Sequence, residues 1–336
     1  MKKILYIGNN LNNKKSNTSS IQVLGTLLET EGFEMHYASS KNNKVLRLFD
    51  MVWNCITMSK KIDYVLIDTY STTNFYYALV VSQLCSLLKL KYIPILHGGN
   101  LPDRLKQSPK LSKMIFHNAH KNVSPSLYLL ETFKNNGYLN VDFIPNAIEM
   151  DSYTFKERNF KNINLLWVRS FSKIYNPKLA VKVLKGLQVE GFHATLCMVG
   201  PDSDGSLLEV MQLAKSLHVD VTFTGKLTKE AWITLSKDFN IFINTTNFDN
   251  MPVSVIEAMA LGLPVISTNV GGLPFLIANN IDGVLVAKDH EEGFVKAVKS
   301  IVNNPEKTKI MTNKAREKVI AFDWELVKTK WFQVLE

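Results

Sequence analysis

Short apolar runs that alternate with longer amphipathic segments constrain the fold of this chain most. The runs are rich in β-branched and aromatic residues, and segments such as residues 21–31 carry apolar residues at helical spacing. In the first half they fall at residues 4–7, 33–38, 64–67, 92–96 and 141–144, and the pattern restarts at residues 163–168, 194–199, 219–223, 240–244, 265–268 and 284–286. Such alternation is typical of parallel sheets covered by helices on both faces. The sequence therefore predicts two doubly wound α/β domains in tandem, with a ligand cleft between them.

A length of 336 residues suits two domains better than one. We expect an N-terminal domain over residues 1–150, a polar linker over 151–162, a C-terminal domain over 163–320 and a final helix over 321–336. In that last segment Trp324, Val327 and Trp331 fall on one helical face. The final helix is thus predicted to pack against a domain.

Composition is that of an ordinary globular protein, with 46% hydrophobic and 21% charged residues. Cys55, Cys85 and Cys197 stand in apolar segments without paired spacing, which predicts core residues in a reducing compartment. The chain starts directly on a predicted strand, and the longest apolar stretch, near residues 76–88, is short for a membrane span. We expect a cytoplasmic protein.

Positive charge is concentrated in the first half, where residues 1–150 hold 17 Lys and Arg against 10 Asp and Glu. Two groups flank apolar residues: Lys41, Lys44, Arg47, Lys60 and Lys61 around residues 45–49, and Arg104, Lys106, Lys110, Lys113 and Lys121 around residues 114–116. Such groups predict an anionic acceptor or peripheral contact with an anionic membrane. The alternative is that they are solvated faces of core helices. Nucleic acid is not expected as a partner, because stacking aromatics are not interleaved with these cations.

Residues 248–272 carry the most informative motif. Asp249 and Glu257 bracket an apolar run that opens with Pro252, a residue favoured at the first helical position. The first free helical amides then belong to Val253 and Ser254, and they form a site for a phosphate. Glu257 follows one turn later, where it can accept hydrogen bonds from a hydroxylated ligand. The arrangement suits a phosphate flanked by two sugars.

The same stretch resembles the signature of the family-4 (group 1) retaining glycosyltransferases, which have the GT-B fold. That family has two acids eight positions apart, usually both glutamate, followed by Ala-Met-Ala, Gly-Leu-Pro and Val-Gly-Gly. This chain keeps the spacing, but it has Asp249 at the first acid, Asn269 where aspartate is common and Phe275 where an acid often stands. The resemblance implies that Glu257 holds the nucleotide ribose and that Asp249 meets the transferred sugar. It also implies that the final helix, residues 321–336, packs back on the first domain.

Arg169 and Lys173 follow the predicted strand at residues 163–168. Strand ends are where α/β sheets meet ligands, and cations there can stabilise a departing diphosphate. The resembled family uses an arginine and a lysine at this place, typically five residues apart, whereas the separation here is four. Lys173 can instead be a solvated surface cation.

His97 and Asn100 enclose two glycines after the predicted strand at residues 92–96. The resemblance places this histidine near the transferred sugar and the acceptor; the alternative is a tight turn with an exposed histidine. Gly8 leads into a polar loop over residues 11–20 that can meet an acceptor or be a flexible tip. The dinucleotide fingerprint is absent there, which counts against NAD.

By the same resemblance Gly200, Gly225 and Lys226 border the nucleotide base, with UDP and GDP both open. We expect no metal site: Asp202 and Asp204 fit a turn after a strand, and His117 and His120 lack a third ligand. No cofactor is predicted besides the nucleotide-sugar co-substrate.

The resemblance implies an enzyme that transfers a sugar, with retention, from a nucleotide-sugar to a saccharide or lipid-linked acceptor, and we expect this to serve surface glycan synthesis. The alternatives are a sugar-nucleotide epimerase of similar fold and a catalytically weak sugar-nucleotide-binding protein.

Overall fold

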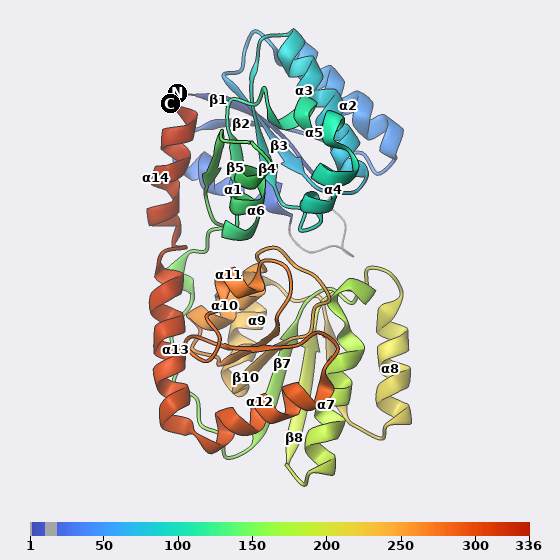
Figure 1. The fold of residues 1–336 in the computed structure, drawn as a ribbon, viewed down its shortest axis with the longest axis vertical. Coiled ribbons are helices and arrows are strands. Elements are labelled where there is room, and N and C mark those ends of the chain that lie inside the picture. Colours follow the sequence, from blue (N-terminus) through green and yellow to red (C-terminus); the bar gives the residue numbers. More distant parts are fainter. Residues whose placement is uncertain (1, 11–18) are drawn as a thin grey trace. The chain divides into compact units, whose positions relative to one another are not determined.

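The computed structural model describes residues 2–10 and 19–336, and its chain forms two compact units (Figure 1). Among the described residues, unit 1 comprises residues 2–10, 19–147 and 324–336, and unit 2 comprises residues 148–323. Each unit is built around its own parallel six-stranded sheet.

The sheet of unit 1 has the strand order β2-β1-β3-β4-β5-β6. Its strands are β1 (Lys3–Ile7), β2 (Glu34–Ala38), β3 (Tyr64–Thr69), β4 (Lys91–Leu96), β5 (Asn122–Ser124) and β6 (Val141–Phe143). Strand β1 pairs in parallel with both neighbours, with Leu5 opposite His36 on β2 and Val65 on β3. All six carboxyl ends therefore meet at one edge of the sheet.

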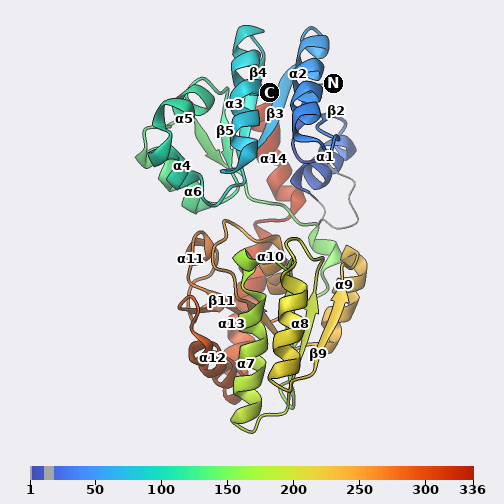
Figure 2. The ribbon, with the colours of Figure 1, turned by 90° about the vertical axis from the view of Figure 1, so that its right-hand side faces the viewer.

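Both faces of this sheet are covered. Helices α1 (Ser20–Thr30) and α14 (Trp324–Leu335) pack on one face, where Ile4 and Tyr6 join the same core as Trp324 and Trp331. The other face carries α2 (Lys44–Met58), α3 (Thr73–Leu87), α4 (Leu101–Gln107), α5 (Pro109–Phe116) and α6 (Leu127–Asn135), as Figure 2 shows. The alternation of side chains along β1 explains the two cores, because Leu5 and Ile7 point to the second one.

The sheet of unit 2 has the strand order β12-β11-β10-β7-β8-β9. Its strands are β7 (Ile163–Val168), β8 (Ala194–Val199), β9 (Val221–Gly225), β10 (Ile241–Asn244), β11 (Val265–Thr268) and β12 (Val284–Val286). Its helices are α7 (Pro177–Val189), α8 (Ser206–Ser216), α9 (Lys229–Leu235), α10 (Val253–Ala260), α11 (Leu273–Leu276), α12 (Glu291–Asn303) and α13 (Pro305–Ile320), with short 3₁₀ turns η1 (Met150–Ser152), η2 (Lys173–Tyr175) and η3 (Ser236–Asp238). Trp167 on β7 joins the core under α7 and α12, and Leu166 joins the core under α10 and α13.

The predicted class of two doubly wound, Rossmann-like domains is confirmed. The predicted core positions of Cys55, Cys85 and Cys197 are also confirmed, since all three are free and buried. Strand β5 was not predicted, and other strands differ from the predicted runs by one or two residues. The run at residues 219–223 becomes β9 at Val221–Gly225, because the left-handed His218 (φ 52°) ends the preceding turn.

The expected linker, residues 151–162, is held against unit 2. Tyr153 is fully buried in the core under α10. The guanidinium of Arg158 donates hydrogen bonds to the carbonyl oxygens of Ser236, Phe239 and Leu261 at 2.7–3.0 Å. Polar residues in this stretch therefore serve two purposes: some face solvent, and Arg158 binds backbone carbonyl oxygens of unit 2.

The two basic segments of unit 1 differ in the structure. Val45, Leu46 and Phe49 are exposed beside the lysines of the first segment. In the second segment Met114 is 42% exposed, whereas Ile115 and Phe116 of α5 are fully buried. Among residues 2–10 and 19–336, we find no helix with the length and apolar character that a membrane span requires.

Candidate functional site

The loop that carries Asp249 leads from β10 into α10. Pro252 is the N-cap residue, one position earlier than expected, because its ψ of 117° is extended and the helix starts at Val253. Val253 and Ser254 therefore supply the first helical amides, which have no acceptor within their own helix. The Ser254 hydroxyl is buried and has no hydrogen-bond partner among the described residues. This helix end thus offers two amides and one hydroxyl to a ligand.

Paired glycines hold this loop in place. The Gly272 N–H donates to the Asp249 carbonyl oxygen at 3.0 Å. A Cβ at Gly271 would lie 2.1 Å from the Asp249 carbonyl oxygen, and one at Gly272 would lie 1.9 Å from that of Asn250. Only residues without a side chain permit this approach, so the Val-Gly-Gly part of the motif positions Asp249.

Asp249 forms an ion pair with Arg169, whose backbone follows β7. The two side chains are 14% and 15% exposed. The Arg169 guanidinium also lies over the ring of Tyr175, 4.1 Å from its centroid. The structure therefore brings together two of the predicted catalytic residues in a largely desolvated position.

Lys173 does not join them. Its ammonium is 74% exposed and lies 3.6 Å from the Glu209 carboxylate on α8. Its backbone N–H donates to Asp204 at 2.9 Å. Partial burial favours the neutral form of Asp204, but hydrogen bonds from Ser206, from Ser172 and from backbone amides lower its pKa to about 2. Asp202 and Asp204 are thus hydrogen-bonded turn residues, as the sequence indicated.

Glu257 is buried on the first turns of α10. Its Oε1 accepts a hydrogen bond from the Tyr153 hydroxyl at 2.6 Å, and the Lys229 ammonium lies 3.8 Å away. Burial raises the pKa of Glu257, while Lys229 and Tyr153 oppose that rise. The carboxyl group is therefore held at a fixed position next to one cation.

Tyr153 and Lys229 were not predicted as site residues. Tyr153 stands in a stretch that reads as a linker, residues 151–162, and nothing there distinguishes it from the aromatic residues Phe155 and Phe160. Lys229 is the first residue of α9 and belongs to no motif.

The predicted base-binding glycines lie at the same edge of the sheet. The Gly200 N–H, after β8, donates to the carbonyl oxygen of Gly225 at the end of β9 at 2.9 Å. A Cβ at Gly200 (φ +147°) would lie 1.9 Å from the Arg169 carbonyl oxygen, so glycine is required there. Lys226 follows β9 with an exposed side chain. Arg169, Gly200 and Gly225 therefore gather at three adjacent strand ends.

In unit 1 the predicted His97 follows β4. Its Nε2 lies 2.8 Å from Oδ1 of Asp68 on β3, and its ring stacks on Tyr70 with centroids 5.3 Å apart. The imidazole is 9% exposed, so the alternative of an exposed histidine is wrong. Asp68 also accepts a hydrogen bond from the Tyr6 hydroxyl at 2.9 Å.

Asp68 was not predicted, although it is the one acid inside a run of buried strand residues. Its Oδ2 is buried and has no hydrogen-bond partner among the described residues. A Cβ at Gly8 would lie 2.3 Å from that oxygen, which explains glycine at the end of β1. Asn100 is exposed at the start of α4, where it is the N-cap residue. Most of the predicted polar loop, residues 11–18, falls outside the described residues.

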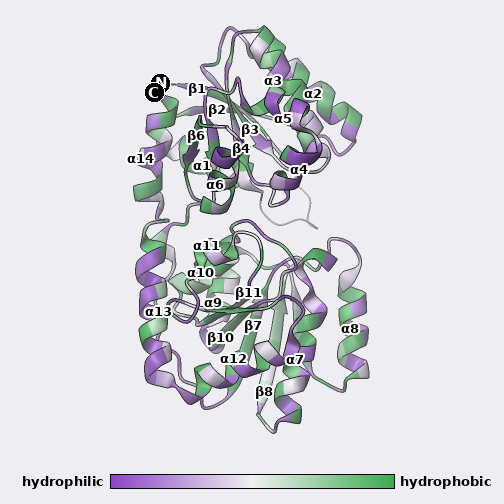
Figure 3. Cartoon of the chain, in the orientation of Figure 1, coloured by the Kyte–Doolittle hydropathy of each residue, from purple (hydrophilic) through white to green (hydrophobic). Residues whose placement is uncertain are grey.

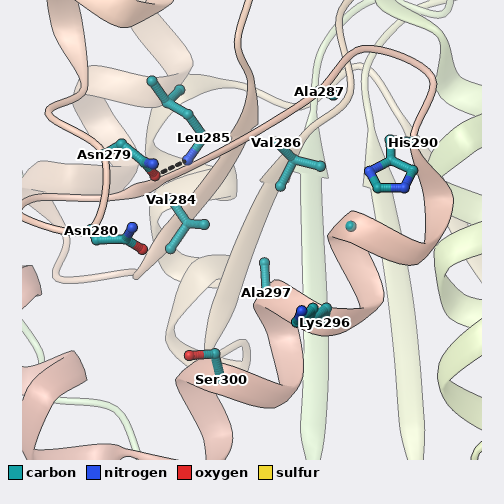
Figure 4. A pocket seen from close by; sticks show the side chains of 11 residues that line it. Asn279, Asn280, Val284, Leu285, Val286, Ala287, His290, Lys296, Ala297 and Ser300 are labelled. Atoms are coloured by element: carbon teal, nitrogen blue, oxygen red, sulfur yellow. Dashed lines mark hydrogen bonds between the residues drawn. The ribbon is translucent and has the colours of Figure 1, made fainter.

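A separate depression of about 310 Å³ lies between β12 and α12 (Figure 4). His290, Lys296 and Ser300 line it together with Asn279 and Asn280. It contains none of the residues predicted for the donor or the acceptor.

Comparisons with known proteins agree with this geometry. Residues 152–318 match the family described as "Glycosyl transferases group 1". Over 157 residues the chain is 27% identical to the N-acetyl-alpha-D-glucosaminyl L-malate synthase of Bacillus anthracis, a match that covers 46% of this chain and 40% of that protein. The chain spans half or less of the length of the curated relatives that it matches.

Several solved structures are similar over the whole chain. The sucrose-phosphate synthase of Thermosynechococcus elongatus has a TM-score of 0.83 at 17% identity, covering 99% of this chain and 98% of that one. Anabaena HepE, solved in complex with UDP and glucose, has a TM-score of 0.81 at 15% identity, covering 100% of this chain and 99% of that one. They confirm the predicted GT-B fold.

Proposed function

Because this chain belongs to the group 1 glycosyltransferases, we propose that it transfers a sugar from a nucleotide-sugar to a saccharide or lipid-linked acceptor with retention of anomeric configuration. The observation that carries the proposal is the cluster at the strand ends of unit 2. There the Arg169 guanidinium forms an ion pair with Asp249, and the loop that carries Asp249 leads into the first amides of α10.

The donor is proposed to bind to unit 2. Two free amides and the unpartnered Ser254 hydroxyl at the start of α10 suit the oxygens of a diphosphate. Glu257, fixed by Tyr153, is proposed to accept hydrogen bonds from the ribose hydroxyls. Gly200, Gly225 and Lys226 are proposed to border the base at the neighbouring strand ends. A UDP-linked sugar is the first donor to test, and GDP-linked sugars are the second.

In the proposed reaction the bond between the anomeric carbon and the diphosphate oxygen breaks. The acceptor oxygen bonds to the same carbon on the same face, and an oxygen of the departing diphosphate takes the acceptor proton. Negative charge on the diphosphate grows as this bond breaks, and the fixed Arg169 guanidinium stabilises it without reorganisation. Asp249 is proposed to contact the transferred sugar, and Lys173 to reach the diphosphate only if it leaves Glu209.

Unit 1 is proposed to bind the acceptor near His97. The Tyr6–Asp68–His97 hydrogen bonds fix the orientation of the imidazole. Gly8 and Asn100 are proposed to line the same acceptor side. We also propose a cytoplasmic location and a peripheral contact of unit 1 with an anionic membrane, which suits a lipid-linked acceptor of surface glycan synthesis.

A thermal-shift screen against nucleotides and nucleotide-sugars tests the donor site. A ligand that binds only the folded protein stabilises it by about 2.7 kcal/mol at 100 times its Kd, so one nucleotide class should raise Tm clearly above the others. The same ligand should shift Glu257→Ala less. Equal shifts for all nucleotides, or none, would contradict the donor assignment.

A binding protein with weak turnover is the second candidate. It is favoured by Asp249, which replaces the usual glutamate and already neutralises Arg169. Release of nucleotide that depends on an added acceptor would exclude it, and would also exclude an epimerase, which needs no acceptor.

A further inference from the structure

Helix α2 exposes an apolar face to solvent. Phe49 and Trp53 are 67% and 68% exposed, and Val45, Leu46 and Ile56 are also exposed. We call these five side chains the α2 outer face. The opposite side of the helix is buried through Arg47, Met51 and Cys55. A helix that is apolar on both sides usually has both sides covered.

The α2 outer face is a continuous stripe. Leu46, Phe49, Trp53 and Ile56 are three or four positions apart, so they follow one side of the helix over three turns. Helix α3 lies beside α2, as Figures 2 and 3 show, and exposes Tyr76, Val80 and Leu87 without a single charged residue in the helix. Contiguous exposed apolar surface of this kind marks an interaction site.

Positive charge stands at both ends of the stripe. Lys41 lies before α2, Lys44 is its first residue, and Lys60 and Lys61 follow its end; all four are exposed. The one acid on the helix, Asp50, is half-buried and accepts a hydrogen bond from the Ser39 amide at 2.7 Å. The outer face is therefore apolar in the middle and cationic at its ends.

Arg47, expected to belong to this cationic group, does not contribute. Its guanidinium is buried and donates hydrogen bonds to the carbonyl oxygens of Lys41 and Asn42 and to the Asn9 side chain. The second basic segment adds no comparable stripe, since Ile115 and Phe116 are in the core and Met114 alone of residues 114–116 is exposed.

We propose that the α2 outer face docks on an anionic lipid surface. Phe49 and Trp53 would enter the boundary between headgroups and acyl chains, and the lysines at the two ends would meet lipid phosphates. A second copy of this chain is a poorer occupant, because a symmetric contact would bring lysines at helix ends against one another. This inference rests on the proposed function, which gives an anionic membrane as a partner of unit 1. It adds that the α2 outer face is the surface that contacts this membrane.

Trp53 provides a direct test. The other four tryptophans, Trp167, Trp232, Trp324 and Trp331, are all buried. Quenching by acrylamide therefore reports chiefly on Trp53. With phosphatidylglycerol vesicles at low salt we expect a blue-shifted emission and reduced quenching, and with phosphatidylcholine vesicles neither. Trp53→Phe should lose the signal and still sediment with the anionic vesicles.

Paired variants separate the contributions of the stripe and the lysines. Phe49→Gln with Trp53→Gln is compared with Leu208→Gln and Met211→Gln, two exposed apolar residues of α8 in unit 2. Lys44→Gln with Lys60→Gln is compared with Lys307→Gln and Lys314→Gln on α13. Each α2 pair should lower the partition coefficient on anionic vesicles roughly 10- to 30-fold, as expected for two cations or two anchors. The control pairs should leave it unchanged.

Two outcomes would overturn the proposal. One is vesicle binding that is equal in the α2 pairs and their controls. The other is a concentration-dependent dimer without lipid that protects Trp53, which would make a second copy the occupant. Thermal shift by a nucleotide is measured on the same variants. If the double variants of α2 keep the thermal shift of the wild type, they are folded. If the wild type itself shows no shift, the proposed donor site is contradicted, but the vesicle-binding result still stands.

Discussion

Arg169 and Asp249, 80 positions apart in the sequence, form an ion pair in unit 2. The sheet topology explains this contact. Strand β7, which precedes Arg169, lies next to β10, which precedes the Asp249 loop. Parallel neighbours end at the same edge, so both side chains reach the same place. A diphosphate bound there would present Arg169 with a second anion, and the ion pair would have to adjust.

Arg169→Ala should reduce turnover more than it weakens donor binding. The negative charge of the diphosphate is greatest in the transition state, where the guanidinium acts most strongly. Steady-state kinetics with the donor identified by thermal shift should show a lower kcat and a smaller change in KM. Arg169→Lys serves as the control that keeps the charge. A raised KM with unchanged kcat would show uniform binding and contradict the role.

Asp249→Asn should lower transfer while leaving the affinity for free nucleotide nearly intact. We expect this because the proposed contact of Asp249 is with the transferred sugar, which free nucleotide lacks. Calorimetric titration with the nucleoside diphosphate, beside the transfer assay, measures both effects. Equal losses would mean that Asp249 holds the nucleotide, or that Arg169 needs its partner to stay in position.

Much of the fold was predictable because buried parallel strands leave apolar runs in the sequence. The run at residues 4–7 corresponds to β1 (Lys3–Ile7). The run at residues 163–168 corresponds to β7 and has the same bounds. The start of β9 was displaced because His218, which precedes the strand, is left-handed, and the sequence has no clear signal for that conformation. Long motifs were also informative: Gly271 and Gly272 follow Asp249 because their backbone touches it.

The partners of the site residues were not predictable. Asp68 meets His97 through the pairing of β3 with β4, and nothing near His97 in the sequence indicates it. Tyr153 reaches Glu257 from 104 positions away. Burial likewise decided which cations are available: Arg47 looks like a surface charge in the sequence, but it binds backbone carbonyls.

Glu257→Ala should weaken nucleotide affinity by roughly 1.5–3 kcal/mol, the range for hydrogen bonds to a charged group. Tyr153→Phe is the matched control, because it removes a partner of the carboxylate and leaves the carboxylate itself. Its effect on affinity should be smaller. A folded Glu257→Ala protein with an unchanged dissociation constant would show that the ribose is bound elsewhere.

Glu257 should also make stability depend on pH. Burial raises its pKa in the folded protein, and Lys229 and Tyr153 only partly oppose the rise. The folded state thus keeps this proton to a higher pH than the unfolded state. Between the two pKa values the folded state binds more protons, so the free energy of unfolding falls as pH rises. Below the unfolded pKa the contribution of this group to stability is fully present, and above the folded pKa it is lost.

Glu257→Gln should remove this fall, because glutamine cannot ionise and still offers an acceptor to Tyr153. Scanning calorimetry without nucleotide, between about pH 4 and pH 8, should span the start of the transition, since an ordinary glutamate has a pKa of about 4.3. We expect the variant and the wild type to have similar Tm at the acidic end, and the variant to have the higher Tm at neutral pH. Parallel curves for the two proteins would contradict this prediction. They would show that Lys229 fully offsets the effect of burial on the pKa of Glu257, so that ionising the carboxyl group does not destabilise the folded state.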